Sequence, residues 1–366
     1  MAYTELEARE LVAEAGRKLL EKGLVARTWG NISARVSDTH FIITPSGMAY
    51  DTMKPQQLVL VDGRDGSWEG DRKPSSEKGI HADAYRLRPE VSFVIHTHQD
   101  MASVLGVAGM DLVTGHPLLG GRVPCAAYGL PSTDQLRQAV AREMEDWPRS
   151  PAILLRHHGA VCLGQSMDHA FAVAEALEEV CGKKVRKTLP IPDLPLYVPD
   201  FGESVRQGVL FYLTISGKTQ VFPVAEPSSL PPAAALHAAI YWGTSAQAVV
   251  HQRGRDTVAM SVSGKPLRPM LDDQAQIAGA NLLCVSPSPQ QVLRGLRGRN
   301  AVLLREAGAL CTGNCLEDAR AAAHLLEKGC TASRFAGAVS RSRPLGRGDA
   351  LLQRTLYVTQ YAKRKG

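Results

Sequence analysis

The feature that most constrains the fold of this 366-residue chain is that its second half repeats its first. Residues 152–164, AILLRHHGAVCLG, match residues 301–313, AVLLREAGALCTG. Two shorter matches occur in the same order, Pro74-Ser75-Ser76 with Pro227-Ser228-Ser229 and Val94-Ile95-His96 with Val249-Val250-His251. Three matches in one order are hard to obtain by chance, so we expect a duplicated structural unit.

A proline-rich stretch separates the two copies. Residues 189–199, LPIPDLPLYVP, contain four prolines, a composition typical of a stiff linker and not of the interior of a helix or strand. We therefore expect a first domain at 1–188, a linker at 189–203 and a second domain at 204–366. The length agrees with two domains, because one hydrophobic core rarely serves so many residues.

The first half alternates between helix and strand patterns. Thr4 and Glu7 form a capping box ahead of an apolar helical stripe that ends at Gly23. Apolar β-rich runs predict strands, and amphipathic runs predict further helices. The expected strands are 41–44, 58–61, 91–95 and 152–155, and the expected helices are 77–87 and 168–184. This alternation is compatible with an α/β fold.

Histidines gather where two of the expected strands end. His96 and His98 are two residues apart, and side chains at that spacing on a strand point to the same face. His157 and His158 follow the strand at 152–155. Three imidazoles and one carboxylate are a common ligand set for catalytic zinc, and Glu77 is the candidate carboxylate.

Three short polar loops have the composition of phosphate-binding turns, at residues 28–33, 44–47 and 74–76. Their small residues allow a close approach to the backbone, and none of them is a P-loop or a dinucleotide-binding motif. Ser75 or Ser76 is also a favoured residue for capping the helix that follows. Capping and anion binding at a helix N-terminus are compatible roles.

Five motifs together resemble the class II aldolase/adducin family, which includes fuculose-phosphate aldolase. They are Gly30-Asn31-Ile32-Ser33, Thr44-Pro45-Ser46-Gly47, Pro74-Ser75-Ser76-Glu77, His96-Thr97-His98 and His157-His158-Gly159. The resemblance covers residues 5 to about 185 well and the remainder only through the repeat. It implies a three-layer α/β/α fold with a central, mainly antiparallel sheet, present here in tandem.

The resemblance also implies the roles of single residues. A zinc ion, or manganese or cobalt in its place, would be bound by His96, His98 and His158, with Glu77 as the catalytic carboxylate. His158 is preferred to His157 because the family's third ligand directly precedes the glycine. The positions that match the family's substrate-phosphate site are Gly30, Asn31, Ser46, Gly47, Ser75 and Ser76.

The activity that the resemblance implies is cleavage of a ketose 1-phosphate to dihydroxyacetone phosphate and an aldehyde. The metal would act as a Lewis acid, and Glu77 would move the proton at the neighbouring carbon. The alternatives are a sugar-acid phosphate decarboxylase or a pentulose-phosphate 4-epimerase of the same superfamily, and a non-enzymatic adducin-like scaffold. The family's tyrosine proton donor is missing from Gly115-His116-Pro117-Leu118, which leaves Tyr128, Tyr357 and Tyr361 as substitutes.

The second half keeps the framework and loses the chemistry. In the sequence alignment Glu77, His98 and His158 are replaced by Leu230, Arg253 and Ala307. We therefore expect one metal per chain. A duplicate of this kind could take the place of a neighbouring subunit and cover the metal site, in a homo-oligomer for which a dimer of two-domain chains is preferred.

Composition excludes other classes. The net charge of +6 comes mainly from the last third, whose basic residues include Arg294, Arg297, Arg299, Arg341, Arg343, Arg347, Lys363, Arg364 and Lys365. They are not interleaved with aromatic residues and no recognition motif stands beside them, which favours a solvated tail or a subunit contact over nucleic-acid binding. We expect no membrane span and no secretory signal, and the seven scattered cysteines suit a cytoplasmic protein.

Overall fold

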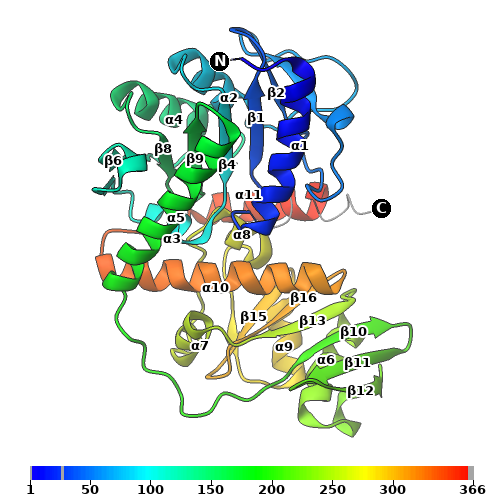
Figure 1. Ribbon diagram of the computed structural model, residues 1–366. Coiled ribbons are helices and arrows are strands. Elements are labelled where there is room, and N and C mark those ends of the chain that lie inside the picture. Colours follow the sequence, from blue (N-terminus) through cyan, green and yellow to red (C-terminus); the bar gives the residue numbers. More distant parts are fainter. Residues whose placement is uncertain (1, 26–28, 362–366) are drawn as a thin grey trace. The chain divides into compact units, whose positions relative to one another are not determined.

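The computed structural model describes residues 2–25 and 29–361, with the side chains of residues 360 and 361 left out (Figure 1). Thr28 of the first polar loop and the basic residues Lys363, Arg364 and Lys365 therefore lie outside the described residues. The chain forms two compact units, Met1–Thr188 with Val339–Ser342 and Leu189–Ala338 with Arg343–Gly366.

The first unit is built on a seven-stranded sheet in the order β3-β2-β1-β4-β9-β8-β7, in which every pairing except β7 with β8 is antiparallel. The strands are β1 (Asn31–Arg35), β2 (His40–Ile43), β3 (Val59–Asp62), β4 (Phe93–Thr97), β7 (Cys125–Ala126), β8 (Ala152–Leu155) and β9 (Ala160–Gly164). A small separate pair consists of β5 (Leu112–Val113) and β6 (Arg122–Val123).

Helices cover both faces of this sheet, which gives three layers (Figure 1). They are α1 (Glu5–Glu21), α2 (Lys78–Leu87), α3 (Asp100–Gly106), α4 (Asp134–Asp146) and α5 (Met167–Thr188). Phe41 and Ile43 of β2 belong to the core beneath α2 and α4, because alternate residues of a strand face the same side. The capping box of Thr4 and Glu7 is present, as predicted.

The second unit has the same sheet order, β12-β11-β10-β13-β16-β15-β14, again with one parallel pair at the end. The strands are β10 (Glu203–Gln207), β11 (Leu210–Ile215), β12 (Lys218–Pro223), β13 (Ala248–Gln252), β14 (Cys284–Val285), β15 (Ala301–Leu304) and β16 (Ala309–Gly313). The helices are α6 (Pro232–Gly243), α7 (Arg255–Val262), α8 (Asp272–Ala278), α9 (Pro289–Leu296), α10 (Leu316–Val339) and α11 (Arg347–Leu356).

The same pattern of hydrogen bonds occurs inside each unit, which confirms the predicted tandem repeat. Ser33 bonds His81 and Tyr85 at 2.6 and 2.7 Å, and in the second unit Ser204 bonds His237 and Tyr241, both at 2.6 Å.

A second feature common to both units is a glutamate that accepts N–H groups from the first turn of a helix. Glu178 accepts the N–H groups of Met101 and Ala102, and Glu327 accepts those of Asp256 and Thr257. Such a carboxylate satisfies donors that have no partner within their own helix.

One detail of the alignment was wrong. His81 and Tyr85 correspond to His237 and Tyr241, and this helix register places Ala233 opposite Glu77 in place of Leu230. The Pro-Ser-Ser motif of the second unit lies three residues farther from His237 than the first motif lies from His81, so it misled the alignment. Neither residue is a carboxylate, and the conclusion about the second half does not change.

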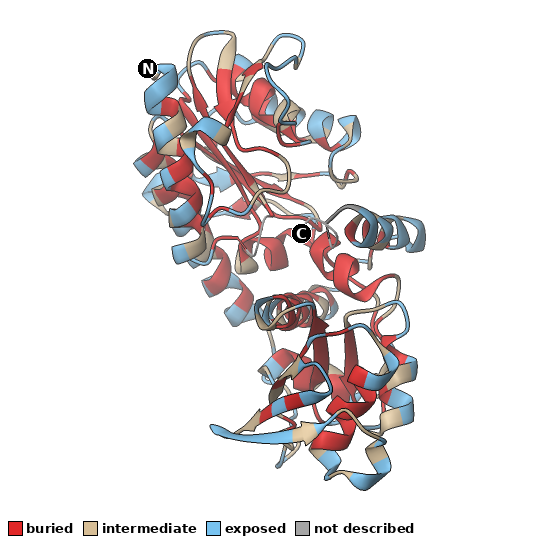
Figure 2. Cartoon of the chain, turned by 90° about the vertical axis from the view of Figure 1, so that its right-hand side faces the viewer, coloured by how far each residue is buried: buried red, intermediate tan, exposed pale blue. Residues whose placement is uncertain are grey.

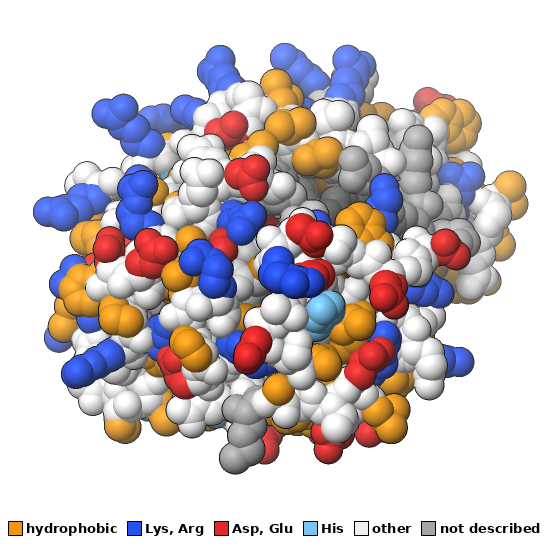
Figure 3. Space-filling model, turned by 90° about the horizontal axis from the view of Figure 1, so that it is seen from above, with side chains coloured by type: hydrophobic (Ala, Val, Ile, Leu, Met, Phe, Trp, Pro, Cys, Tyr) orange, Lys and Arg blue, Asp and Glu red, His pale blue; other side chains and the backbone are white. Residues whose placement is uncertain are grey.

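Burial follows the layers, with the central strands buried and the outer faces of helices exposed, whereas the edge strand β12 is almost wholly exposed (Figure 2). On the face drawn in Figure 3, basic and acidic side chains are interspersed. Within the described part of the chain, every helix is too short or too polar to cross a membrane.

Candidate metal centre

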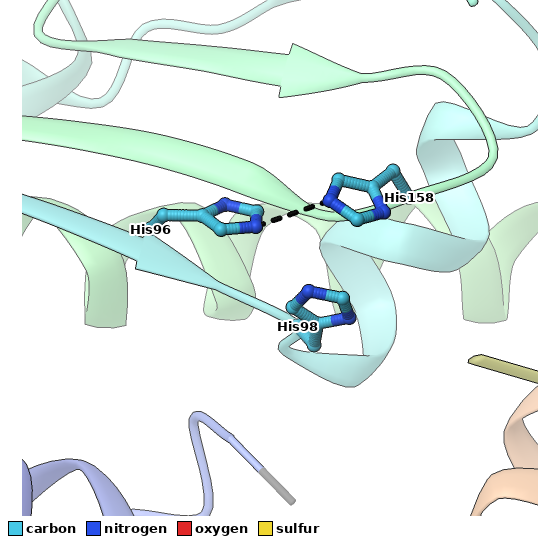
Figure 4. A group of neighbouring side chains, drawn as sticks. All are labelled: His96, His98 and His158. Atoms are coloured by element: carbon cyan, nitrogen blue, oxygen red, sulfur yellow. Dashed lines mark hydrogen bonds between the residues drawn. The ribbon is translucent and has the colours of Figure 1, made fainter. Parts of the chain in front are cut away.

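Three buried histidines converge in the first unit (Figure 4). His96, His98 and His158 are 1, 6 and 4% exposed, and one candidate ligand atom from each lies within 4.8 Å of the others. The Nε2 atoms of His96 and His158 are 3.2 Å apart. Two nitrogens bound to one tetrahedral zinc ion lie roughly 3.3 Å apart, so this spacing fits a shared metal.

The sequence around each histidine explains the convergence. His96 is within β4, and His98 directly follows the end of that strand. His157 has a positive φ of 64° and forms, with His158, the tight turn between β8 and β9. The Leu155 N–H donates to the Gly159 carbonyl at 2.8 Å and closes this turn, which carries His158 back toward β4.

The ring of His96 is oriented for metal binding. Its Nδ1 is 2.9 Å from the carbonyl oxygen of Ala160 and donates its proton there. The proton on Nδ1 leaves the lone pair on Nε2, which is the atom that faces His158. Burial lowers the pKa of His96, and the neutral imidazole is the form that binds a metal.

Glu77 lies beside the same nitrogens. One carboxylate oxygen is 3.3 Å from Nε2 of His96, and the other is 3.4 Å from Nε2 of His158. Burial by itself raises the pKa of Glu77, but the two histidines outweigh it and the net pKa is well below its ordinary value. Glu77 is therefore an ionised carboxylate at the edge of the site.

A buried chain of hydrogen bonds supports Glu77. The side-chain amide of Asn31 donates to Glu77 at 2.9 Å, and its carbonyl oxygen accepts from Nε2 of His81 at 2.5 Å. His81 in turn bonds Ser33, which bonds Tyr85. Burial lowers the pKa of His81 to about 3, so the ring is neutral and fixes which end of the Asn31 amide faces the carboxylate.

The role of His81 was not predicted. The signal that could have found it is the repeat, because a histidine and a tyrosine four residues apart recur at His81 and Tyr85 and at His237 and Tyr241. A chemical group that both copies keep in the core is a sign of a shared buried network.

The three polar loops lie together. The N–H of Ser46 donates to the Lys73 carbonyl, and that of Ser75 donates to the Thr44 carbonyl, both at 3.0 Å. The N–H of Thr44 donates to the Ile32 carbonyl, and the Thr44 hydroxyl accepts the N–H of Ile32. Gly30 and Gly47 have positive φ values, and a side chain at Gly30 would meet the His96 carbonyl oxygen at 2.5 Å.

The serines of the third loop have different neighbours. The Ser75 hydroxyl is buried and accepts the N–H of Glu77 at 3.3 Å, whereas Ser76 is exposed and bonds Ser132 at 2.7 Å. Glu77 itself occupies the N-cap position of α2, so neither serine is the cap residue that the sequence suggested.

One of the three candidate tyrosines lies beside this site. The ring of Tyr128 packs edge-on against His157, with ring centroids 5.6 Å apart. Tyr357 belongs to the second unit, where its ring lies under Arg354, and the side chain of Tyr361 is outside the described residues.

The equivalent place in the second unit has no ligand set. His251 corresponds to His96, but its Nε2 donates to the Ala307 carbonyl at 2.7 Å and its Nδ1 accepts the Phe201 N–H at 2.9 Å. Arg253 pairs with Asp200 at 3.0 Å. Among the residues that the structure describes, no second group of three metal-binding side chains is found.

Replacing Gly159 by alanine should disturb the site without touching a ligand. An added Cβ would lie 2.1 Å from the Thr97 carbonyl oxygen, so β4 must shift between His96 and His98. We expect a loss of about 1–3 kcal/mol in the free energy of unfolding and weaker metal binding. Denaturant titration and metal analysis measure both. Gly115→Ala is the control, since its Cβ meets open space; equal behaviour of the two variants would refute the close approach.

Comparison with known proteins agrees with the geometry. The profile of the class II aldolase and adducin N-terminal domain matches residues 10–185 and again 204–333. A 5-methylthioribulose-1-phosphate/5-deoxyribulose-1-phosphate aldolase of Rhodospirillum rubrum is 33% identical over 184 residues, which are 49% of this chain and 81% of that protein. An L-fuculose phosphate aldolase of Haemophilus influenzae is 32% identical over 176 residues, 47% of this chain and 79% of that protein.

Among solved structures, an L-fuculose 1-phosphate aldolase is similar at 30% sequence identity and a TM-score of 0.47. That match covers 51% of this chain and 88% of the other.

Proposed function

Because the chain belongs to the class II aldolase and adducin family, we propose that its first unit is a metal-dependent aldolase. The reaction is cleavage of a ketose 1-phosphate to dihydroxyacetone phosphate and an aldehyde. The observation that carries this proposal is the convergence of His96, His98 and His158 beside the buried carboxylate of Glu77. The relatives named above are aldolases that act on sugar 1-phosphates or sugar phosphates.

The residues present fit a divalent cation. Three neutral imidazoles suit zinc, and they also accept manganese or cobalt. When bound, the cation would polarise the substrate carbonyl and stabilise the negative charge that develops as the carbon–carbon bond breaks.

The other steps belong to side chains of the first unit. The C4 hydroxyl loses its proton, the C3–C4 bond breaks to release the aldehyde, and C3 gains a proton. We assign the C3 proton to Glu77, which the Asn31 amide holds in a fixed orientation. We assign the substrate phosphate to Gly30, Asn31, Ser46, Gly47, Ser75 and Ser76, because the structure joins their loops.

The experiment is a retro-aldol screen with the full-length protein loaded with zinc, manganese or cobalt. Substrates are fuculose 1-phosphate, 5-deoxyribulose 1-phosphate, 5-methylthioribulose 1-phosphate and other ketose 1-phosphates, and dihydroxyacetone phosphate release is measured by a coupled assay. Release that a chelator abolishes supports the proposal. Stoichiometric metal binding without release from any ketose 1-phosphate would contradict it.

Tyr128→Phe tests which residue exchanges the proton with the oxygen of the aldehyde. We propose that Tyr128, beside His157, donates a proton to the aldehyde oxygen in the direction of condensation. Loss of an acid–base group predicts a roughly 10²-fold lower rate of cleavage. Proton exchange at C3 of dihydroxyacetone phosphate, followed by NMR in D2O, should stay unchanged because Glu77 performs it.

The control for this variant is Tyr197→Phe, an exposed tyrosine of the linker. Cleavage rates that are equal in the two variants would exclude Tyr128 as the donor.

We also propose that the chain forms a homo-oligomer, with a dimer preferred, because closed symmetric assemblies are the commonest among soluble enzymes. Light scattering after size-exclusion chromatography gives the mass directly, and a 39.5 kDa particle at all concentrations would contradict the proposal.

A further inference from the structure

The second unit contains a basic cavity that the proposed reaction does not use. Its volume is about 460 Å³, and it lies where α6 and α9 end and where β15 begins, with one residue from α11. We call it the arginine pocket, after Arg297, Arg299 and Arg354. Thr244, Ser245 and Asn300 contribute further polar groups. None of the described residues that line the pocket is acidic.

The arginines are held by backbone oxygens and by an amide. Arg354 donates to the carbonyls of Gly298 and Gln276 and to the side chain of Asn300, at 2.6–2.9 Å. Arg299 donates from Nε to the Asn281 carbonyl at 2.6 Å. Within the described part of the chain, neither guanidinium pairs with a carboxylate, and the Nη2 group of each has no hydrogen-bond acceptor.

The pKa shifts of these two arginines also indicate positive charge without a neutralising partner. Burial lowers the pKa of Arg299, and burial together with the neighbouring positive charge of Arg299 lowers the pKa of Arg354. Two guanidinium groups that repel each other without a neutralising charge favour an anion between them.

The corresponding corner of the first unit shows what changed after duplication. There Arg88 pairs with Glu90 at 2.7 Å and donates to the Ser150 carbonyl, so the carboxylate of Glu90 neutralises the charge of Arg88. In the second unit the acidic residue is lost, since residues 244–246 are Thr-Ser-Ala. Arg88 is lost as well, because Thr244 stands in its place. The residue that corresponds to Ser150 is Arg299, so this corner keeps an arginine but no carboxylate.

We propose that the arginine pocket binds a phosphorylated small molecule through its phosphoryl group. A guanidinium donates two parallel N–H groups and therefore matches the oxygens of a phosphate. The hydroxyl of Ser245 adds a donor at the rim, whereas that of Thr244 already donates to the Ile240 carbonyl at 2.7 Å. The volume is within the range of small-ligand sites. This site belongs to the second unit and is independent of the metal centre.

The test is hydrogen–deuterium exchange of the full-length protein with pyrophosphate as the probe. Peptides report each unit separately, so binding at the first unit does not interfere. We expect slower exchange over residues 244–246 and 293–300. In Arg297→Glu and Ser245→Glu, the same protection should need at least ~10-fold more pyrophosphate. The first change reverses a positive charge at the pocket and the second adds a negative one, and both residues are exposed, so the fold should tolerate them.

The control is Arg294→Glu, which makes the same change of charge on α9 at an exposed residue outside the lining. It should leave protection near the wild-type level. Citrate serves as a carboxylate competitor, and equal protection by citrate would refute the preference for phosphate. Unaltered exchange in both segments, or equal protection in Arg297→Glu, would show that the arginines only bind backbone carbonyls.

Discussion

His158→Ala is expected to abolish bound metal and aldol cleavage together. The Nε2 atom of His158 is 3.2 Å from that of His96, so its loss removes one of three ligands from a buried site. Removing a group that merely supports a ligand costs ~10–100-fold, and loss of the ligand itself should exceed that. Metal content by mass spectrometry and cleavage rate at saturating substrate are measured on the same preparation. His96→Ala should behave in the same way.

Two matched controls accompany these variants. His157→Ala alters the neighbouring residue of the same turn, and His251→Ala alters the counterpart of His96 in the second unit. Both should keep their metal. Full occupancy in His96→Ala and His158→Ala would overturn the ligand assignment, and metal loss in His157→Ala alone would mean that the other histidine of the pair is the ligand.

The Glu77→Gln variant is expected to keep its bound metal and to lose most of its catalytic activity. The amide retains the shape of the carboxylate and one acceptor oxygen for the Asn31 side chain, but it cannot take up a proton at C3. A removed acid–base group predicts a fall of ~10²-fold or more in turnover and in proton exchange of dihydroxyacetone phosphate. Glu90→Gln, which changes a partly exposed carboxylate of the same unit, is the control. Turnover at the wild-type rate in Glu77→Gln would assign the proton to another residue.

Local patterns predicted single elements and the repeat, whereas the layered architecture was expected from the family resemblance. The strand pattern at residues 152–155 and its repeat at 301–304 predict β8 and β15 to the residue. Such runs are short, wholly apolar and bounded by polar turns, so their type and limits are set locally. The strand expected at 91–95 is displaced, since β4 spans Phe93–Thr97 and includes His96. A polar residue looks like the end of a strand when its buried partners come from distant parts of the chain.

The sequence was less informative about the surroundings of the site. Asn31 matches a phosphate-binding position, and the structure adds contacts that the sequence did not predict, because its amide bonds Glu77 and His81. Side-chain direction depends on contacts between residues 46 to 50 positions apart, which no local pattern records. The arginine pocket was not predicted for a similar reason, because Arg299 was counted among the basic residues of the last third and Arg354 was not singled out, although the fold places both at one pocket.

The most direct test of the central claim is a metal titration of activity. The full-length protein is freed of metal with a chelator, and zinc or manganese is added back in steps while cleavage of the best ketose 1-phosphate is followed. We predict that activity rises linearly and reaches its plateau at one metal per chain, since the described residues of the second unit offer no ligand set. Full activity before metal is added, or a linear rise that continues to two metals per chain, would contradict the account.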